Sequence, residues 1–137
     1  MLKWIAAYIG TGVAFAAVDF VWLSTMTNRL YKPVIGPIMA AKPDMVAAVL
    51  FYLIYIGGIV FLAIAPALKE GLWTKAALNG AVLGFVAYAT YDLTNQATLA
   101  VWDVKLTVLD LMWGTFLTTA AATAGYFAAG FAGGRAV

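Results

Sequence analysis

Three aspartates lie in stretches of the sequence that are otherwise apolar: Asp19, Asp92 and Asp110. An ionised carboxylate inside a bilayer costs a few kcal/mol at least, so such a side chain faces the interior of a helix bundle or a wet cavity. Crowded, poorly solvated carboxylates suit proton uptake and release, cation binding or general-acid catalysis. These three residues are therefore the candidate chemical centre of the chain.

Helical spacing identifies the side chains that accompany each carboxylate. Positions i−4, i+3 and i+4 share a face with residue i of a helix, and around Asp92 they hold Tyr88, Asn95 and Gln96. The same rule places a tryptophan three residues after each of the other two aspartates. If these faces converge they form a pocket, and its predicted substrate-binding residues are Asp19, Trp22, Tyr88, Asp92, Asn95, Gln96, Asp110 and Trp113.

The expected depth in the membrane supports this convergence. Asp19 and Asp92 each lie seven residues, or roughly 10 Å, before the expected end of their helices. Asp110 lies five residues, or about 8 Å, after the expected start of its helix on the same side. The sequence thus predicts three carboxylates at one level. Because like charges repel, at least one of them is expected to hold a proton near neutral pH.

A purely structural role is the alternative for each aspartate. A lone intramembrane carboxylate can bond a Ser, Thr or Asn side chain across a helix interface. It can also extend towards the nearby membrane surface, and Asp110 is shallow enough for that. Three carboxylates at one level, with two amides beside one of them, favour a functional site.

The composition is that of a membrane protein. Of the 137 residues, 65% are hydrophobic and 10% are charged, whereas about a quarter of the residues of a soluble domain are charged. The absence of Cys and His excludes disulfide frameworks, thiol nucleophiles, Cys/His zinc sites and histidine acid–base chemistry. The net charge of +2 is too small to indicate nucleic-acid binding. A Mg²⁺ site has no recognised oxygen-ligand motif here, so we expect no metal and no cofactor.

Four segments are long enough to cross a bilayer, which takes about 20 apolar residues each. Each must be helical, because backbone groups inside lipid need partners within their own segment. The apolar run at the N-terminus is longer than that of a signal peptide, so we expect a retained span. We predict one all-α domain over residues 1–137, a compact bundle of four transmembrane helices at about 4–26, 45–65, 74–99 and 105–128, with an interfacial loop over 28–44.

The basic residues leave the orientation of this bundle open. Four helices put both termini on one side of the membrane, and the positive charges divide four against four between the two sides. The two groups are Lys3, Lys69, Lys75 and Arg135 on the terminal side, and Arg29, Lys32, Lys42 and Lys105 on the other.

Small residues indicate where helices touch. Gly80 and Gly84 form a GxxxG pair, and residues 120–125 are rich in Ala and Gly, so the third and fourth helices are predicted to pack closely. The stretches "VAFAAVDFVW" (13–22) and "VAYATYDLTN" (86–95) are alike, which suggests two parallel two-helix repeats. Chance is the alternative, because Val, Ala and aromatic residues are common in any spanning helix.

The connection over residues 28–44 is long for a helix hairpin. It is basic and partly amphipathic, and it lies on the same side as the carboxylates. We expect a linker that lies on the bilayer and meets lipid headgroups, with a lid over the site as the alternative.

Several stretches resemble the bacterial membrane proteins grouped as domain of unknown function 2177. They are "VDFVWL", "RLYKPVIG", "LFYLIYIGGIVFLAIAPAL", "GFVAYATYDLTNQATL" and "VWDVKLTVLDLMWGT", and the resemblance covers nearly the whole chain. Its most specific parts are residues 91–95 and 110–114. The resemblance implies a compact four-helix membrane protein, and it implies no activity. We expect the chain to be a multi-pass protein of the bacterial inner membrane.

Three functions remain open at this stage. The first is binding or transport of a proton, a cation or a small polar substrate in the carboxylate pocket. The second is an enzyme that modifies a lipid or isoprenoid by general-acid chemistry, with Trp22, Trp113 and Tyr88 stabilising a cationic intermediate through their ring faces. The third is a small subunit or assembly factor of a larger membrane complex. The expected partners are membrane lipids and either a second copy of the chain or a larger complex.

Overall fold

The computed structural model describes residues 1–134, which form a bundle of helices without strands. Arg135, which the charge count above includes, lies outside the described residues. The elements are α1 (Leu2–Met26), a π-helical turn (Thr27–Tyr31), α2 (Lys32–Ile35), a 3-10 turn (Gly36–Ile38), α3 (Met45–Ile59), a second π-helical turn (Val60–Ile64), α4 (Ala65–Glu70), α5 (Trp73–Thr98) and α6 (Val104–Ala132).

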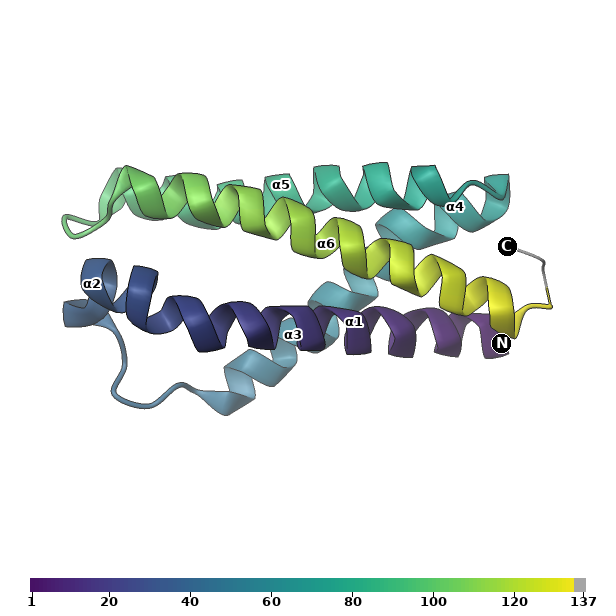
Figure 1. Ribbon diagram of the computed structural model, residues 1–137, viewed down its shortest axis with the longest axis horizontal. Helices are drawn as coiled ribbons and strands as arrows, with labels where there is room; N and C mark the ends of the chain where they lie inside the picture. Colours follow the sequence, from purple (N-terminus) through teal and green to yellow (C-terminus); the bar gives the residue numbers. More distant parts are fainter. Residues whose placement is uncertain (135–137) are drawn as a thin grey trace.

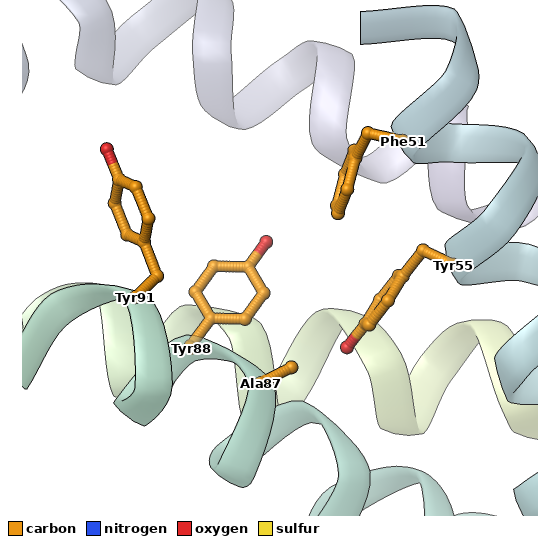
Figure 2. A pocket seen from close by; sticks show the side chains of 5 residues that line it. All are labelled: Phe51, Tyr55, Ala87, Tyr88 and Tyr91. Atoms are coloured by element: carbon orange, nitrogen blue, oxygen red, sulfur yellow. The ribbon is translucent and has the colours of Figure 1, made fainter. Parts of the chain in front are cut away.

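The last helix organises the bundle. α5 and α6 form a long antiparallel hairpin, and α6 lies between α5 and α1 in the view of Figure 1. α6 accordingly carries a buried residue on almost every turn from Leu106 to Gly130. α3 and α4 complete the bundle, and aromatic side chains of α3 and α5 face each other (Figure 2). The predicted all-α four-helix bundle is confirmed.

Small residues allow α5 and α6 to approach closely. A Cβ atom added at Gly80 would lie 2.8 Å from the Cβ of Ala122, and one added at Gly84 would lie 2.8 Å from the hydroxyl oxygen of Thr118. Both separations are shorter than van der Waals contact, so only glycine fits at these two positions. The predicted close packing is confirmed, and the GxxxG pair contacts a helix of the same chain, α6. A homodimer, expected from the small size of the chain, stays a prediction.

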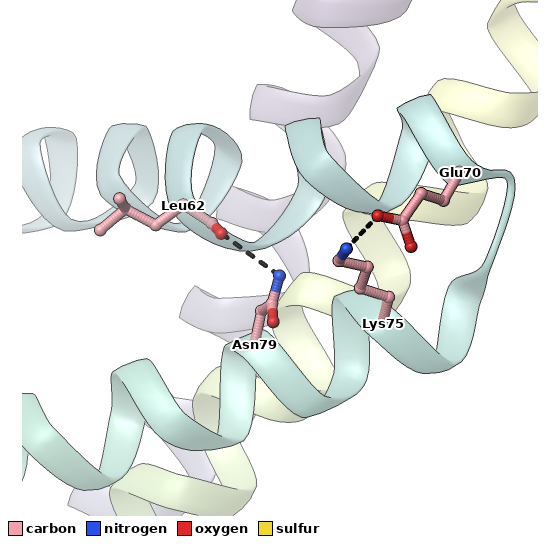
Figure 3. A network of polar contacts seen from close by, with 4 residues as sticks. All are labelled: Leu62, Glu70, Lys75 and Asn79. Atoms are coloured by element: carbon pink, nitrogen blue, oxygen red, sulfur yellow. Dashed lines mark hydrogen bonds and ion pairs between the residues drawn. The ribbon is translucent and has the colours of Figure 1, made fainter.

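The second long helix is interrupted where Pro66 follows the π-helical turn. Proline has no N–H to donate to the carbonyl of Leu62, four residues earlier, and the side-chain amide of Asn79 on α5 donates to that oxygen at 3.5 Å (Figure 3). α4 then ends at Gly71, whose φ of 71° is left-handed. Glu70 and Lys75 form an ion pair across this turn (Figure 3).

Two helical stretches are long and apolar enough to cross a membrane. They are Leu2–Ile38, with 37 residues and a mean hydropathy of 1.6, and Met45–Glu70, with 26 residues and a mean hydropathy of 2.5. In each, only 22% of the most apolar window is buried inside the protein. A core helix of a soluble protein would be mostly buried, so these outward faces suit contact with lipid.

The connection expected as a loop over residues 28–44 is helical as far as Ile38. The first helix continues through Thr27–Tyr31 because no helix breaker occurs there, and Pro33 stands in the first turn of α2, where its missing N–H is tolerated. The sequence Gly36-Pro37 then ends the helix. As a result, Tyr31 is carried into the bundle instead of lying on the bilayer.

The two predicted repeats differ in their second helix. α6 is continuous over 29 residues, whereas its counterpart is divided into α3, the turn Val60–Ile64 and α4. The duplication therefore stays a prediction.

Substituting Gly84 tests the packing of α5 on α6. We expect Gly84→Ala to lower the free energy of unfolding by about 1–3 kcal/mol, because the new methyl group meets backbone and side-chain atoms of α6. Gly58→Ala is the matched control: nothing lies within 4 Å of a Cβ at that position, and alanine favours the helix by about 0.5–1 kcal/mol. Thermal unfolding in detergent measures both, and equal melting temperatures for the two variants would contradict the packing described.

A double-mutant cycle tests the contact of Asn79 with Leu62. Asn79→Ala should cost about 0.5–1 kcal/mol of stability, because it leaves a carbonyl group without its donor. In a Pro66→Ala background the new backbone N–H can replace that donor, so the same substitution should cost much less. An equal loss of stability in the two backgrounds would show that the Asn79 amide does not donate to this carbonyl group.

Candidate functional site

The three aspartates are buried on three different helices. Asp92 on α5 is 0% exposed, Asp110 on α6 is 3% exposed and Asp19 on α1 is 7% exposed. Among residues 1–134 the one ion pair joins Lys75 to Glu70, so no basic side chain is paired with any of the three. The buried carboxylates are thus uncompensated by charges of the described chain.

Asp110 accepts a short hydrogen bond from outside its own helix. The Tyr31 hydroxyl donates to its Oδ1 at 2.5 Å, and the Trp22 Nε1–H donates to the Tyr31 oxygen at 2.9 Å. The Trp22 ring stacks on Trp113, with centroids 4.2 Å apart and planes inclined by 7°. This chain of contacts fixes the end of the first long helix against α6.

Asp19 is held in a similar way by α3. The Tyr52 hydroxyl donates to its Oδ2 at 2.5 Å. Phe15, one turn earlier on α1, makes edge contacts with the rings of Tyr52 and Tyr55, with centroids 5.7 and 5.6 Å away. The Tyr55 hydroxyl in turn shares a hydrogen bond of 2.9 Å with Thr118 on α6. Two tyrosines of α3 therefore form hydrogen bonds with buried side-chain oxygens of α1 and α6.

Asp92 has no such partner. No hydrogen-bond donor among the described residues reaches either of its carboxylate oxygens or the Gln96 Oε1, and the Trp113 Nε1–H finds no acceptor among them. An orphaned polar group in an apolar interior costs roughly 1–3 kcal/mol, and an unpaired charge costs more. Three unsatisfied polar groups on the facing helices α5 and α6 mark this region as the place where the chain by itself is incomplete.

The register of α5 on α6 places Asp92 opposite Asp110. Gly84 meets Thr118, and the Tyr88 ring occupies the space beside Gly114. A further step of four residues along the antiparallel pair brings the two carboxylates to one level. They lie within electrostatic range of each other.

Asp19 lies deeper than this pair. Because Trp22 stacks on Trp113, and α1 and α6 run in opposite directions, Asp19 and Asp110 lie on opposite sides of the stacked rings, roughly 9 Å apart along the bundle. The expectation of a single level therefore holds for two aspartates and not for the third. Its premise was wrong because the chain stays helical beyond Met26, through the π-helical turn Thr27–Tyr31, so the distance to Met26 was not a distance to the membrane surface. Asp19 and Asp110 are still within electrostatic range.

A pocket of about 320 Å³ opens beside the carboxylates, between α3 and α5. Its lining is largely aromatic: Phe51, Tyr55, Ala87, Tyr88 and Tyr91. Figure 2 shows the Tyr88 hydroxyl pointing into the space between the other rings. Tyr88 is within electrostatic range of Asp19 and Asp110, and Tyr91 is within range of Asp92 and Asp110. Tyrosines thus connect the pocket to the buried carboxylates.

The structure brings most of the predicted site residues together. Tyr88 and the stacked tryptophans lie beside the carboxylates, and Gln96 directs a buried oxygen into the same interior. Asn95 is half-buried, and its side chain makes no hydrogen bond with the described residues. Within residues 1–134, no three acidic side chains are grouped so that they could hold a metal ion.

Sequence reasoning missed the tyrosines that bond the carboxylates. Tyr52 and Tyr55 occur three residues apart in an aliphatic span, and a phenol at that depth needs a polar partner, so a signal for them was present. Tyr31 had no such signal, because its position depends on the helical continuation of α1. The missed residues are Tyr31, Phe51, Tyr52, Tyr55 and Tyr91.

Comparison with known proteins gives one match. Residues 4–127 match the family described as "Predicted membrane protein (DUF2177)". No curated protein and no solved structure matches the chain.

A double-mutant cycle tests the bond between Tyr31 and Asp110. Tyr31→Phe should lower the free energy of unfolding by about 1–2 kcal/mol, because the carboxylate loses its donor. In an Asp110→Leu background the same change should have little effect. Tyr91→Phe, which removes a hydroxyl without a hydrogen bond in the described chain, is the control. Additive costs of the two substitutions, measured by unfolding in detergent, would show that the pair is not coupled.

Proposed function

The chain belongs to the DUF2177 family of predicted membrane proteins, and we propose that it is a multi-pass protein of the bacterial inner membrane that binds a proton and a small cationic or polar substrate at its buried carboxylates. In this proposal α5 and α6 cross the membrane together with the two more apolar stretches. Transport in this proposal depends on the binding and release of the proton and the substrate at the carboxylates.

The length and the outer surface of α5 and α6 support four crossings. With 26 and 29 residues, they are roughly 39 and 44 Å long, more than the 30 Å or so of the hydrocarbon layer. Their hydropathy is lowered by buried glycines and aspartates on both helices and by buried threonines on α6. Their outer sides expose large apolar residues: Leu78, Val82, Phe85, Val108, Met112 and Phe116.

The observation that carries the proposal is the state of Asp92. Its carboxylate is fully buried and unbonded, and Asp110 faces it across α5 and α6. A carboxylate in this position is stable only if a proton or another cation neutralises it, because no basic side chain of the described residues does so. Proton and substrate then compete for the same negative charge, and this competition couples the binding of one to the release of the other.

The three carboxylates are unequal, which suits this role. Asp19 and Asp110 each accept a hydrogen bond from a tyrosine hydroxyl, and such a bond stabilises the ionised form of an acceptor. Asp92 receives no bond of this kind. We therefore assign proton exchange to Asp92.

The enzyme alternative receives less support. It relied on Trp22, Trp113 and Tyr88 to stabilise a cationic intermediate, and the stacking of Trp22 on Trp113 covers one face of each indole ring. A role as a subunit or assembly factor, and the expected contacts with lipids or a second copy, stay predictions.

Infrared spectroscopy of the reconstituted protein tests the role of Asp92. We expect the carbonyl band of a protonated carboxylic acid to persist at neutral pH and to disappear in Asp92→Asn, because the buried group holds its proton there. Glu70→Gln, which changes an exposed carboxylate at the opposite end of the bundle, should leave the band in place. Substrate flux in proteoliposomes should collapse in Asp92→Asn as well. A band and a flux unchanged by that variant would overturn the proposal.

A further inference from the structure

We infer that the aromatic pocket between α3 and α5 binds a lipophilic organic cation, such as a quaternary ammonium compound, that enters sideways from the bilayer. The inference rests on the proposed function, and it names the substrate class of the same site. The first ground is the lining, in which four of the five residues are aromatic and none is basic. Aromatic rings attract an organic cation through the negative faces of their π-systems, and such rings commonly line sites for quaternary ammonium groups.

The electrostatics of the pocket select a positive ligand. Behind its tyrosines lie three carboxylates without ion-pair partners in the described chain. An anion would be repelled, and a neutral molecule would gain no electrostatic attraction. A small hydrated metal ion would find no carboxylate oxygen in the lining itself. An organic cation matches both the aromatic walls and the negative potential.

Only some of the tyrosine hydroxyl groups around the pocket form hydrogen bonds. Those of Tyr31 and Tyr52 donate to carboxylates, and that of Tyr55 bonds Thr118. Within residues 1–134, the hydroxyls of Tyr88 and Tyr91 make no hydrogen bond. Their oxygens therefore remain free to accept from a protonated amine or to lie against the methyl groups of a quaternary one.

The size and the opening of the pocket fit entry from lipid. A volume of about 320 Å³ is at the small end for ligand sites and suits a single ring with an ammonium group. Phe51 is 48% exposed and Tyr91 is 55% exposed, and they stand on α3 and α5 at the outer side of the pocket (Figure 2). Phe51 lies seven residues after Asp44, the N-cap of α3, or roughly 10 Å along the helix. Amphiphilic cations gather at about this depth, near the polar boundary of the membrane.

A pair of isosteric ligands tests the inference. Tritiated benzyltrimethylammonium is bound to the purified protein in lipid nanodiscs, and unlabelled benzyltrimethylammonium or neopentylbenzene, in which carbon replaces the charged nitrogen, is added as competitor. We expect the charged competitor to displace the label at concentrations at least tenfold lower than the neutral one. Equal displacement by both, or no specific binding of the label, would overturn the inference.

Matched variants locate the binding. Tyr91→Leu and Phe51→Leu should weaken binding about two- to fivefold each, because each removes one ring from the pocket. Tyr91→Phe keeps the ring and loses only the hydroxyl, so it should lose less affinity than Tyr91→Leu. Phe85→Leu removes an exposed ring of α5 outside the pocket and should have no effect. Equal losses for Phe85→Leu and Tyr91→Leu would place the cation elsewhere and overturn the inference.

The outcomes separate this inference from the proposed function. Absence of cation binding, together with an infrared band that depends on Asp92, would overturn the inference and leave proton binding intact. Cation binding that responds to Tyr91→Leu but is unchanged by Asp92→Asn and by pH would support the aromatic pocket and remove the proposed coupling. Binding that weakens in both variants and on acidification would support both.

Discussion

The structure depends on the placement of three carboxylates where lipid cannot reach them and where no basic side chain of the described residues pairs with them. Their side chains come from α1, α5 and α6, so the helices that carry them must surround a common interior. Two of them obtain a tyrosine hydroxyl as partner, from Tyr31 and Tyr52. These two bonds fix the end of the first long helix to α6 and fix α3 to α1. The hydrogen bonds that the buried carboxylates need thus also hold the helices together.

Close helix packing is the second condition, and glycine provides it. Gly84 and Gly114 allow α5 and α6 to approach until the Tyr88 ring fits beside the α6 backbone. The register that follows brings Asp92 opposite Asp110 and leaves both Asp92 oxygens without a donor among the described residues. A bundle built for stability alone would avoid such a group, because an unpaired buried carboxylate is destabilising. Its presence is the ground for the proposed binding of a proton or ligand at this site.

The aromatic pocket and the carboxylates form one arrangement with a division of roles. The rings of α3 and α5 face each other across the pocket (Figure 2), and the buried carboxylates lie within electrostatic range of its tyrosines. Tyr88 belongs to both, since it lines the pocket and lies within electrostatic range of two carboxylates.

Composition and helical periodicity determined the class of the protein, the four helices and the residues that share a face with each carboxylate, because these properties depend on neighbours a few positions apart along the chain. Residue counts also predicted equal depths, and this failed for Asp19 because the chain stays helical past Met26, the end of α1. Only the tertiary structure decided which oxygen receives a donor. The bond from Tyr31 to Asp110 joins residues 79 positions apart, and it requires the helical continuation past Thr27, the stacking of Trp22 on Trp113 and the register of α1 on α6 together. Such long-range geometry arises from the packing of whole helices, which local sequence patterns do not encode.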